Sequence, residues 1–338
     1  MQHATFVSTC TALDPDAAAL LVRAQEAGYP PFEALTPTQA RKAYAASWAI
    51  MQTPGGDVHS VLDVEIEADE PLKLRIYRGL TCDEKRPAPC MLFLHGGGWV
   101  IGNLESHDRM CRQLANMAGM CVVAVDYRLA PEHPYPAALR DASAALQWVI
   151  AHADELNIAP HAVGVGGDSA GGNLAAVLAL MSRDKALSAI CLQALFYPAT
   201  DLTAVSGSYR RFTSGLPLTA STMHYFIDHY VPVGMDKTDW RISPLHATSF
   251  KGVAPAIVMT VAHDPLCDEG RAYAKRLDED GVRVAAFHYN DHMHGVLSQG
   301  NCVDMANGIS QQVFSTVGQY MHQALKRSTE ASATPRQI

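Results

Sequence analysis

A serine in a short glycine-flanked turn is the residue whose type and setting first point to chemistry. The turn reads Gly-Asp-Ser-Ala-Gly over 167–171, with Ser169 at its centre, after an apolar run at 161–168 and before a helix-like segment at 170–182. A strand–turn–helix setting is the one in which this pattern lifts a serine nucleophile above a sheet. A hydroxyl needs a neighbouring base to attack an ester carbonyl. Because the pattern alone also fits an ordinary turn, the prediction depends on further residues.

A second glycine-rich segment, His-Gly-Gly-Gly-Trp at 95–99, directly follows a run of apolar residues. Backbone amides in such a loop can hold the oxyanion of a tetrahedral intermediate without obstruction by side chains. A phosphate-binding loop is the alternative, but the segment lacks the lysine of a P-loop and the spacing of a dinucleotide motif. We therefore predict an oxyanion hole formed by the amides of Gly97, Gly98 and Ala170, with Gly96 as the runner-up.

Two candidate partners for the serine follow it along the chain. Asp264 comes directly after the apolar run at 256–263, and His294 comes shortly after the run at 282–290. The order Ser, Asp, His is typical of a nucleophile, an orienting acid and a general base placed at strand ends. His292 lies only two residues from His294 and is the strongest competitor for the role of base.

Other charged residues near these motifs have ordinary structural interpretations. Asp268 and Glu269 fall in the predicted first turn of a helix, where acidic side chains interact favourably with the helix dipole. Arg128 lies between the carboxylates of Asp126 and Glu132, a pattern that is more often an ion pair fixing a loop than acid–base chemistry.

From about residue 61 onward, short apolar or alternating runs are separated by helix-like segments. This alternation predicts a mostly parallel sheet of eight strands with helices on both faces. The predicted strands are 61–67, 72–79, 90–96, 121–127, 161–168, 190–198, 256–263 and 282–290.

Two segments interrupt this alternation. Residues 1–55 are helical in pattern, and residues 199–243 form an unusually long connection that is rich in aromatic side chains. We predict that both belong to one helical cap. The catalytic domain would then comprise 56–198 and 244–327, and 328–338 would form a flexible tail.

The composition of the 338-residue chain argues against several other classes of protein. The net charge is −8 and the basic residues are scattered, so no nucleic-acid partner is expected. The longest apolar stretches, about eight to ten residues, are too short to span a membrane. No secretory signal is evident at the N-terminus, which favours a cytoplasmic location. The eight cysteines include no C-x-x-C pair, which disfavours a zinc ribbon or a redox site.

Five motifs in order closely resemble those of the hormone-sensitive lipase family, and its bacterial esterases are the nearest in appearance. They are His-Gly-Gly-Gly-Trp, the segment 126–132, Gly-Asp-Ser-Ala-Gly-Gly-Asn, the segment 264–266 and His294-Gly295. The resemblance covers about residues 55–325 and implies an α/β-hydrolase fold with a cap of N-terminal helices plus an insertion after the sixth strand. It also implies hydrolysis of short-chain esters through an acyl-serine intermediate without a metal or cofactor, and it suggests a homodimer.

We therefore expect a serine carboxylesterase that acts on small-molecule esters of short to medium acyl chains. An apolar ester requires an apolar pocket, and the predicted lining residues are Trp99, Tyr197, Leu218 and Phe226. A non-catalytic ligand-binding protein of the same fold is disfavoured because the serine, the acid and the base are all present. Hydrolysis of amides or lactones remains an open alternative.

Overall fold

The structure is a computed structural model that describes residues 12–51, 55–298 and 304–333. Its eight strands form one sheet, and each coincides with one of the runs that the sequence predicts as strands. They are β1 (Ser60–Ile66), β2 (Leu72–Arg78), β3 (Ala88–Leu94), β4 (Cys121–Val125), β5 (Ile158–Asp168), β6 (Gln193–Phe196), β7 (Ala256–His263) and β8 (Val284–Met293).

The strand order across the sheet is β1-β2-β4-β3-β5-β6-β7-β8. Strand β2 pairs antiparallel with both β1 and β4, and every other pairing is parallel. The prediction of a mostly parallel eight-stranded sheet is thus confirmed. Strands β3 and β4 are buried along their whole length, as continuous apolar runs require in a sheet covered on both faces.

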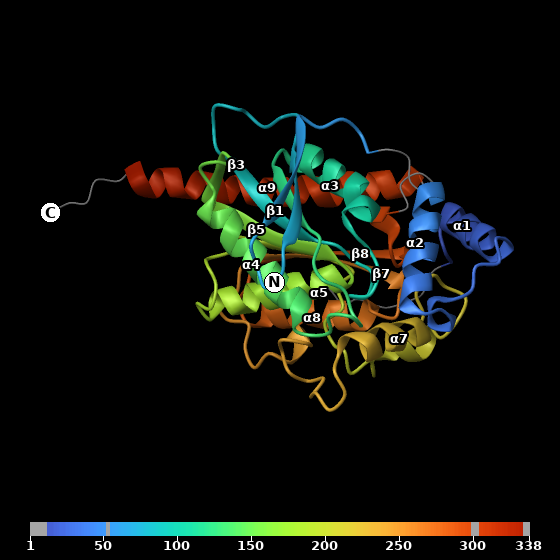
Figure 1. The fold of residues 1–338 in the computed structure, drawn as a ribbon. Helices are drawn as coiled ribbons and strands as arrows, with labels where there is room; N and C mark the ends of the chain where they lie inside the picture. Colours follow the sequence, from blue (N-terminus) through green and yellow to red (C-terminus); the bar gives the residue numbers. More distant parts are fainter. Residues whose placement is uncertain (1–11, 52–54, 299–303, 334–338) are drawn as a thin grey trace.

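Helices cover both faces of this sheet (Figure 1). Helices α3 (Leu104–Ala118) and α9 (Asp304–Ala333) pack together on one face, while α4 (Ala137–Ala151), α5 (Ala170–Arg183) and α8 (Cys267–Glu279) cover the other. Side chains of β3 alternate between the two resulting cores, with Leu92 in one and Phe93 in the other. Helix α9 continues past residue 328, where the sequence predicts a flexible tail; residues 334–338 of that tail lie outside the described part.

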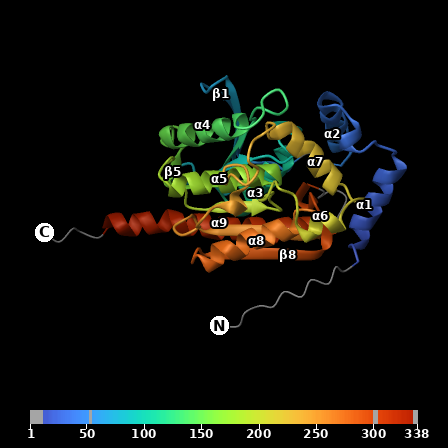
Figure 2. The ribbon, with the colours of Figure 1, turned by 90° about the horizontal axis from the view of Figure 1, so that it is seen from below.

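The two segments that interrupt the alternation carry the remaining helices. The first holds α1 (Pro15–Glu26), the 3-10 turn η1 (Phe32–Ala34) and α2 (Pro37–Met51), and the second holds α6 (Gly207–Arg211) and α7 (Ala220–Tyr230). Two further 3-10 turns, η2 (Pro244–His246) and η3 (Val296–Ser298), follow these elements. In both ribbon views α1, α2 and α7 lie at the same end of the molecule (Figures 1 and 2).

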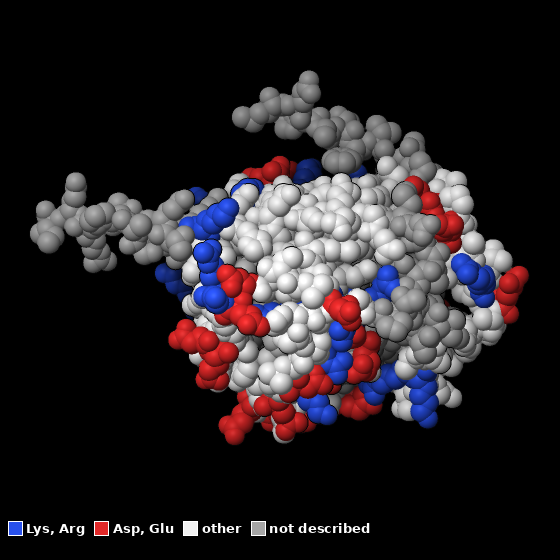
Figure 3. Space-filling view, turned by 90° about the horizontal axis from the view of Figure 1, so that it is seen from above, with Lys and Arg blue, Asp and Glu red and all other residues white. Residues whose placement is uncertain are grey.

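The two cap segments also touch each other. The Phe32 and Phe226 rings lie 6.0 Å apart, and the Thr222 hydroxyl donates to Glu33 at 2.9 Å. In Figure 3 acidic and basic side chains lie beside one another along the edges and the lower part of the face, and a broad area in its middle carries neither. Within the described residues no helix is both long and apolar enough to cross a membrane.

Candidate active site

The turn between β5 and α5 presents Ser169 in a strained conformation. Its φ is 55° and its ψ is −118°, a region that side-chain-bearing residues seldom adopt. Gly167 and Gly171 flank it, and a methyl group at either position would collide with the carbonyl oxygen of Leu94 at the end of β3. The two glycines are therefore needed because backbone passes directly against backbone.

The structure brings Asp264, His294 and Ser169 into one hydrogen-bonded line. Nδ1 of His294 lies 2.7 Å from Oδ2 of Asp264, and Nε2 of His294 lies 3.0 Å from Oγ of Ser169. Asp264 directly follows β7 and is completely buried, and its Oδ1 accepts from the Leu266 amide at 2.8 Å. A proton on Nδ1 shared with the carboxylate leaves Nε2 to accept the serine proton.

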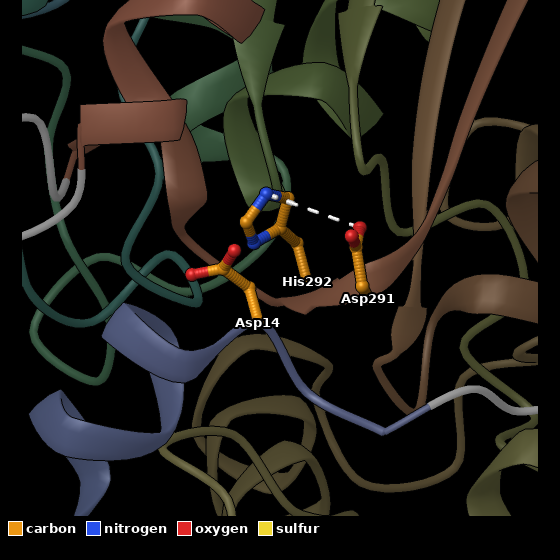
Figure 4. Close-up of side chains that lie close together, drawn as sticks. All are labelled: Asp14, Asp291 and His292. Carbon is orange, nitrogen blue, oxygen red and sulfur yellow. Dashed lines mark ion pairs between the residues drawn. The ribbon is translucent and has the colours of Figure 1, made fainter.

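The competing acids and the competing base have other surroundings. Asp268 accepts from the Ser208 amide at 2.8 Å, and Glu269 accepts from the Thr200 amide at 2.7 Å. His292 is fully buried, and Figure 4 shows its ring beside the carboxylates of Asp14 and Asp291, whereas the histidine that contacts Ser169 is His294.

In the glycine loop after β3, one backbone amide donates a hydrogen bond and two have no acceptor among the described residues. The Gly96 amide donates to Oδ1 of Asp168 at 2.8 Å. Gly97 and Gly98 have φ values of 115° and 58°, and their amides donate to no acceptor within the described ranges. The Ala170 amide is the first of α5, where helix amides lack partners within the helix. This pattern favours Gly97 and Gly98 over Gly96 as donors to an oxyanion.

The model of the alpha/beta hydrolase fold family matches residues 91–298. Ethyl acetate hydrolase of Pseudomonas putida is 36% identical over 303 residues, which are 87% of this chain and 95% of that protein. The chain belongs to the hormone-sensitive lipase family of α/β hydrolases. It is accordingly a carboxylesterase of this family.

Further comparisons agree with this assignment. The chain is 45% identical to the carboxylic ester hydrolase LipN of Mycobacterium tuberculosis over 216 residues. These residues make up 62% of this chain and 57% of LipN. A thermostable esterase from Pseudomonas putida superposes with a TM-score of 0.87 at 32% identity, covering 93% of this chain and 99% of its own. The esterase of Pyrobaculum calidifontis gives 0.83 at 35% identity, covering 91% and 98%.

A buried carboxylate holds the glycine loop of the hydrolase in place. Asp168 accepts from Gly96 and lies 3.2 Å from Nε2 of His107, a residue of α3 that the sequence analysis did not single out. Burial opposes ionisation of Asp168, but the charge of His107 and the hydrogen bonds from His107 and Gly96 outweigh it and lower the pKa of Asp168. Burial and nearby His107 lower the pKa of His95 to about 3, so His95 is neutral at pH 7.

The lowered pKa of Asp168 predicts how the stability of the hydrolase depends on pH. Since the folded state lowers this pKa, the stabilisation is complete above pH about 4, the ordinary value, and is lost as pH falls through the lowered pKa. We expect Asp168→Asn to lower the melting temperature by roughly 5 °C or more at pH 6, because it breaks a buried pair. The difference from the native protein should narrow toward pH 3 in a series of thermal melts.

The matched control for this experiment is Asp184→Asn. Asp184 pairs with Arg183 at 2.6 Å but is about half exposed, so its loss should shift the melting temperature by no more than about 1 °C. A melting-temperature difference for Asp168→Asn that stays constant from pH 6 to pH 3 would contradict the assigned charge on Asp168.

The ion pairs near the motif at 126–132 differ from the predicted ones. Arg128 pairs with Asp141 of α4 at 2.7 Å rather than with its sequence neighbours. Glu132 pairs with Arg41 of α2 at 2.5 Å. The predicted structural role of Arg128 agrees with this ion pair, but the partners come from other elements because these side chains face in different directions. Arg41 also donates to the carbonyl oxygen of Val100 at 2.8 Å, which ties the cap to the glycine loop.

The four predicted pocket residues lie in different surroundings. The Tyr197 ring lies 4.7 Å from the His294 ring, and the Phe226 ring packs directly on Gly98. Trp99 has no exposed surface, and its ring stacks on that of Tyr230 with the centroids 4.4 Å apart. Leu218 is buried in the same core cluster as Phe226.

The close contact between Phe226 and Gly98 makes a prediction for activity. In Gly98→Ala the new methyl group would occupy the position of the Phe226 ring, at a φ of 58° that alanine disfavours. We expect kcat for p-nitrophenyl butyrate to fall by about 10²- to 10³-fold, the loss typical of a misplaced oxyanion donor.

Two further variants separate the causes of this loss. Gly215→Ala places alanine at a φ of 78° with no atom within 4 Å, so it carries the backbone strain without the collision and should keep near-native kcat. The double variant Gly98→Ala with Phe226→Gly removes both the ring and the Cβ atom that would lie 2.7 Å from the new methyl group, so it should recover part of the lost kcat. A double variant no more active than Gly98→Ala would show that the collision is not the cause.

Proposed function

We propose that the protein hydrolyses esters of short to medium acyl chains through an acyl-serine intermediate. Ser169 is the nucleophile, His294 the general base and Asp264 the group that orients the imidazole. The observation that carries this proposal is the hydrogen-bonded line from Asp264 through His294 to Ser169, at 2.7 and 3.0 Å.

In the proposed acylation step, Nε2 of His294 removes the hydroxyl proton while Oγ of Ser169 forms a bond to the carbonyl carbon of the ester. The negative charge moves to the former carbonyl oxygen, where the amides of Gly97, Gly98 and Ala170 hold it. Asp264 stabilises the imidazolium that forms. The intermediate then breaks its bond to the alcohol oxygen, which leaves with the proton from His294.

In the proposed deacylation step, water takes the place of the alcohol. His294 accepts a proton from the water as its oxygen attacks the acyl carbon, and the same amides hold the second oxyanion. The bond to Oγ of Ser169 then breaks, and His294 returns the proton to the serine. The products are a carboxylic acid and an alcohol, and no further reactant is needed.

The preference for short acyl chains is supported by the aromatic cover over the site. Ser169 is only 7% exposed. Phe226 packs on the glycine loop and contacts Phe32 from the first cap segment, while Tyr197 packs on His294. Such a wall suits an apolar acyl group, and the large rings limit its length.

Removing one ring from this wall should change the chain-length preference. We expect Phe226→Ala to raise kcat/KM for p-nitrophenyl decanoate relative to the butyrate by about 10-fold, the scale of a few methylene contacts. Tyr225→Ala removes the neighbouring ring on α7, whose centroid lies 5.4 Å from that of Phe226, and should leave the ratio nearly unchanged. Equal ratios in the native protein and both variants would count against Phe226 as a pocket wall.

The most direct test of the proposed activity is a rate profile over p-nitrophenyl esters of increasing acyl length, with amide and lactone analogues included. We expect the highest kcat/KM between two and eight acyl carbons and much lower values for the amides. Activity confined to long, emulsified esters would refute the short-chain preference, and preferential cleavage of amides or lactones would refute the reaction class.

We further propose that the two cap segments act as one cap, that the protein forms a homodimer and that it works in the cytoplasm. Contacts between the two segments support the single cap, and the family resemblance supports the homodimer.

The cysteines support the cytoplasmic location. Six described cysteines are free, as is usual in a reducing compartment. Light scattering after size-exclusion chromatography tests the dimer, and cell fractionation tests the location.

A further inference from the structure

Three potential metal ligands converge where the first cap segment meets the end of β8. They are Asp14, just before α1, and the neighbouring residues Asp291 and His292 (Figure 4). One ligand atom from each lies within 4.8 Å of the other two. The cluster is separate from the line formed by Ser169 and His294.

Local backbone structure brings these residues together. The Asp14 amide donates to the carbonyl oxygen of Asp291 at 2.8 Å, which fastens the start of α1 to β8. Residues next to each other on a regular strand point to opposite faces, but β8 is irregular here. Its pairing with β7 moves from Val261–Tyr289 to His263–Met293, so β8 carries two extra residues. Such a bulge re-aims side chains and allows Asp291 and His292 to face the same cluster.

His292 is the strongest indication that something is bound at this cluster. Its side chain is completely buried, yet neither ring nitrogen has a hydrogen-bond partner among the described residues. Its nearest charged neighbour is Asp291, with Nε2 and Oδ1 at 4.0 Å. Leaving a buried polar atom unsatisfied is costly, so such an atom in a folded protein calls for a bound partner.

The two carboxylates supply the charge that a cation requires. Asp14 uses Oδ1 to accept from the Asp16 amide at 2.9 Å, and its Oδ2 accepts from no residue in the described segments. Neither Asp14 nor Asp291 is paired with a lysine or arginine in those segments. Two half-buried negative charges beside an unsatisfied imidazole match the ligands of divalent transition metals, whereas Mg²⁺ and Ca²⁺ favour oxygen ligands alone.

We propose that Asp14, Asp291 and His292 bind a divalent transition-metal ion of the Zn²⁺ type, with water completing the coordination. Bonds of about 2.0–2.1 Å in a tetrahedral site place ligand atoms about 3.3 Å apart. In the structure the ligand atoms lie within 4.8 Å of one another. Rotation of the two half-buried carboxylates toward His292 would bring them to the distance that the ion requires. The ion would bridge α1 to the strand end that precedes His294. It takes no part in the proposed reaction, which needs no metal.

Metal binding to the full-length protein tests this proposal. The protein is stripped with a chelator and titrated with Zn²⁺ at pH 7.5 against a chromophoric competitor, and its melting temperature is measured with and without Zn²⁺. We expect one tight site per chain and a higher melting temperature with Zn²⁺. Asp14→Asn combined with Asp291→Asn should weaken binding by at least about 100-fold and remove the rise in melting temperature.

The control variant is Glu84→Gln. Glu84 forms an exposed carboxylate–histidine pair with His59 at 2.7 Å, so its loss tests for unspecific surface binding. Near-native affinity in this variant, with loss in the double variant, supports the site. The proposal is overturned if no ion binds at one per chain, if both variants bind alike, or if lowering the pH without metal raises the melting temperature in a way that depends on Asp14 and Asp291. The last result would identify a proton on His292 as the partner.

Discussion

Ser169→Ala is expected to abolish hydrolysis of p-nitrophenyl butyrate, with kcat falling by at least about 10⁴-fold. The hydroxyl oxygen of this residue lies 3.0 Å from Nε2 of His294. Alanine removes the nucleophile and keeps the backbone of the turn, so the fold should persist. Steady-state rates and circular dichroism measure both outcomes.

The control for this variant is Ser143→Ala. The Ser143 hydroxyl donates to the Leu139 carbonyl oxygen of its own helix at 2.7 Å, away from the proposed site, so kcat should change less than about 2-fold. A fluorophosphonate probe should label the native protein and Ser143→Ala but not Ser169→Ala. Residual turnover or labelling in a folded Ser169→Ala protein would assign the nucleophile elsewhere.

Asp264→Asn is expected to lower kcat by about 10⁴-fold, the loss that follows when an amide replaces a buried carboxylate of this kind. The amide can donate a hydrogen bond to Nδ1 of His294, which places the imidazole proton on Nε2. Nε2 then faces Ser169 as a donor and cannot accept its proton. The loss should appear in kcat more than in KM in steady-state kinetics, because the binding pocket is unchanged.

Asp268→Asn is the matched control, since Asp268 lies in the first turn of α8 and contacts Ser208 and Arg211 rather than His294. We expect less than a 10-fold change in its kcat, in keeping with an exchange at a partly exposed ion pair. Comparable losses in the two variants would mean that the carboxylates act through the stability of α8 and not through the imidazole.

Much of the sheet and of the serine turn could be predicted from local sequence patterns. The fully apolar runs of β3 and β4 can be satisfied only by burial on both faces, and glycines on both sides of Ser169 mark a turn that backbone crosses closely. Order along the chain then restricts the acid and the base to the ends of later strands. Patterns of this kind are local, so they can be recognised without knowing which segments meet.

The supporting contacts could not be predicted in this way. Arg41 meets Glu132 across 91 positions, and His107 meets Asp168 across 61, and neither partner lies in a repeated or spaced pattern. His292 could be recognised as a competitor for His294, but its burial beside Asp14 follows from a strand irregularity without a clear mark in the sequence. The place of Trp99 could not be predicted either, because an aromatic residue beside a glycine loop fits a pocket wall and a core equally well.

The carbonyl oxygen of Leu94 lies against both glycines of the serine turn, and the chain continues from it directly into the glycine loop. The proposed nucleophile and the proposed oxyanion donors are thus positioned by main chain packed on main chain and by the Asp168 side chain, which joins the serine turn to Gly96. The proposed wall for the acyl group, in contrast, includes the rings of Phe32 and Phe226, which come from the two predicted cap segments. Substitutions in the cap can therefore alter which esters are accepted while the reacting geometry stays the same. Related enzymes can therefore change their substrate preference through cap substitutions while kcat for the reaction is retained.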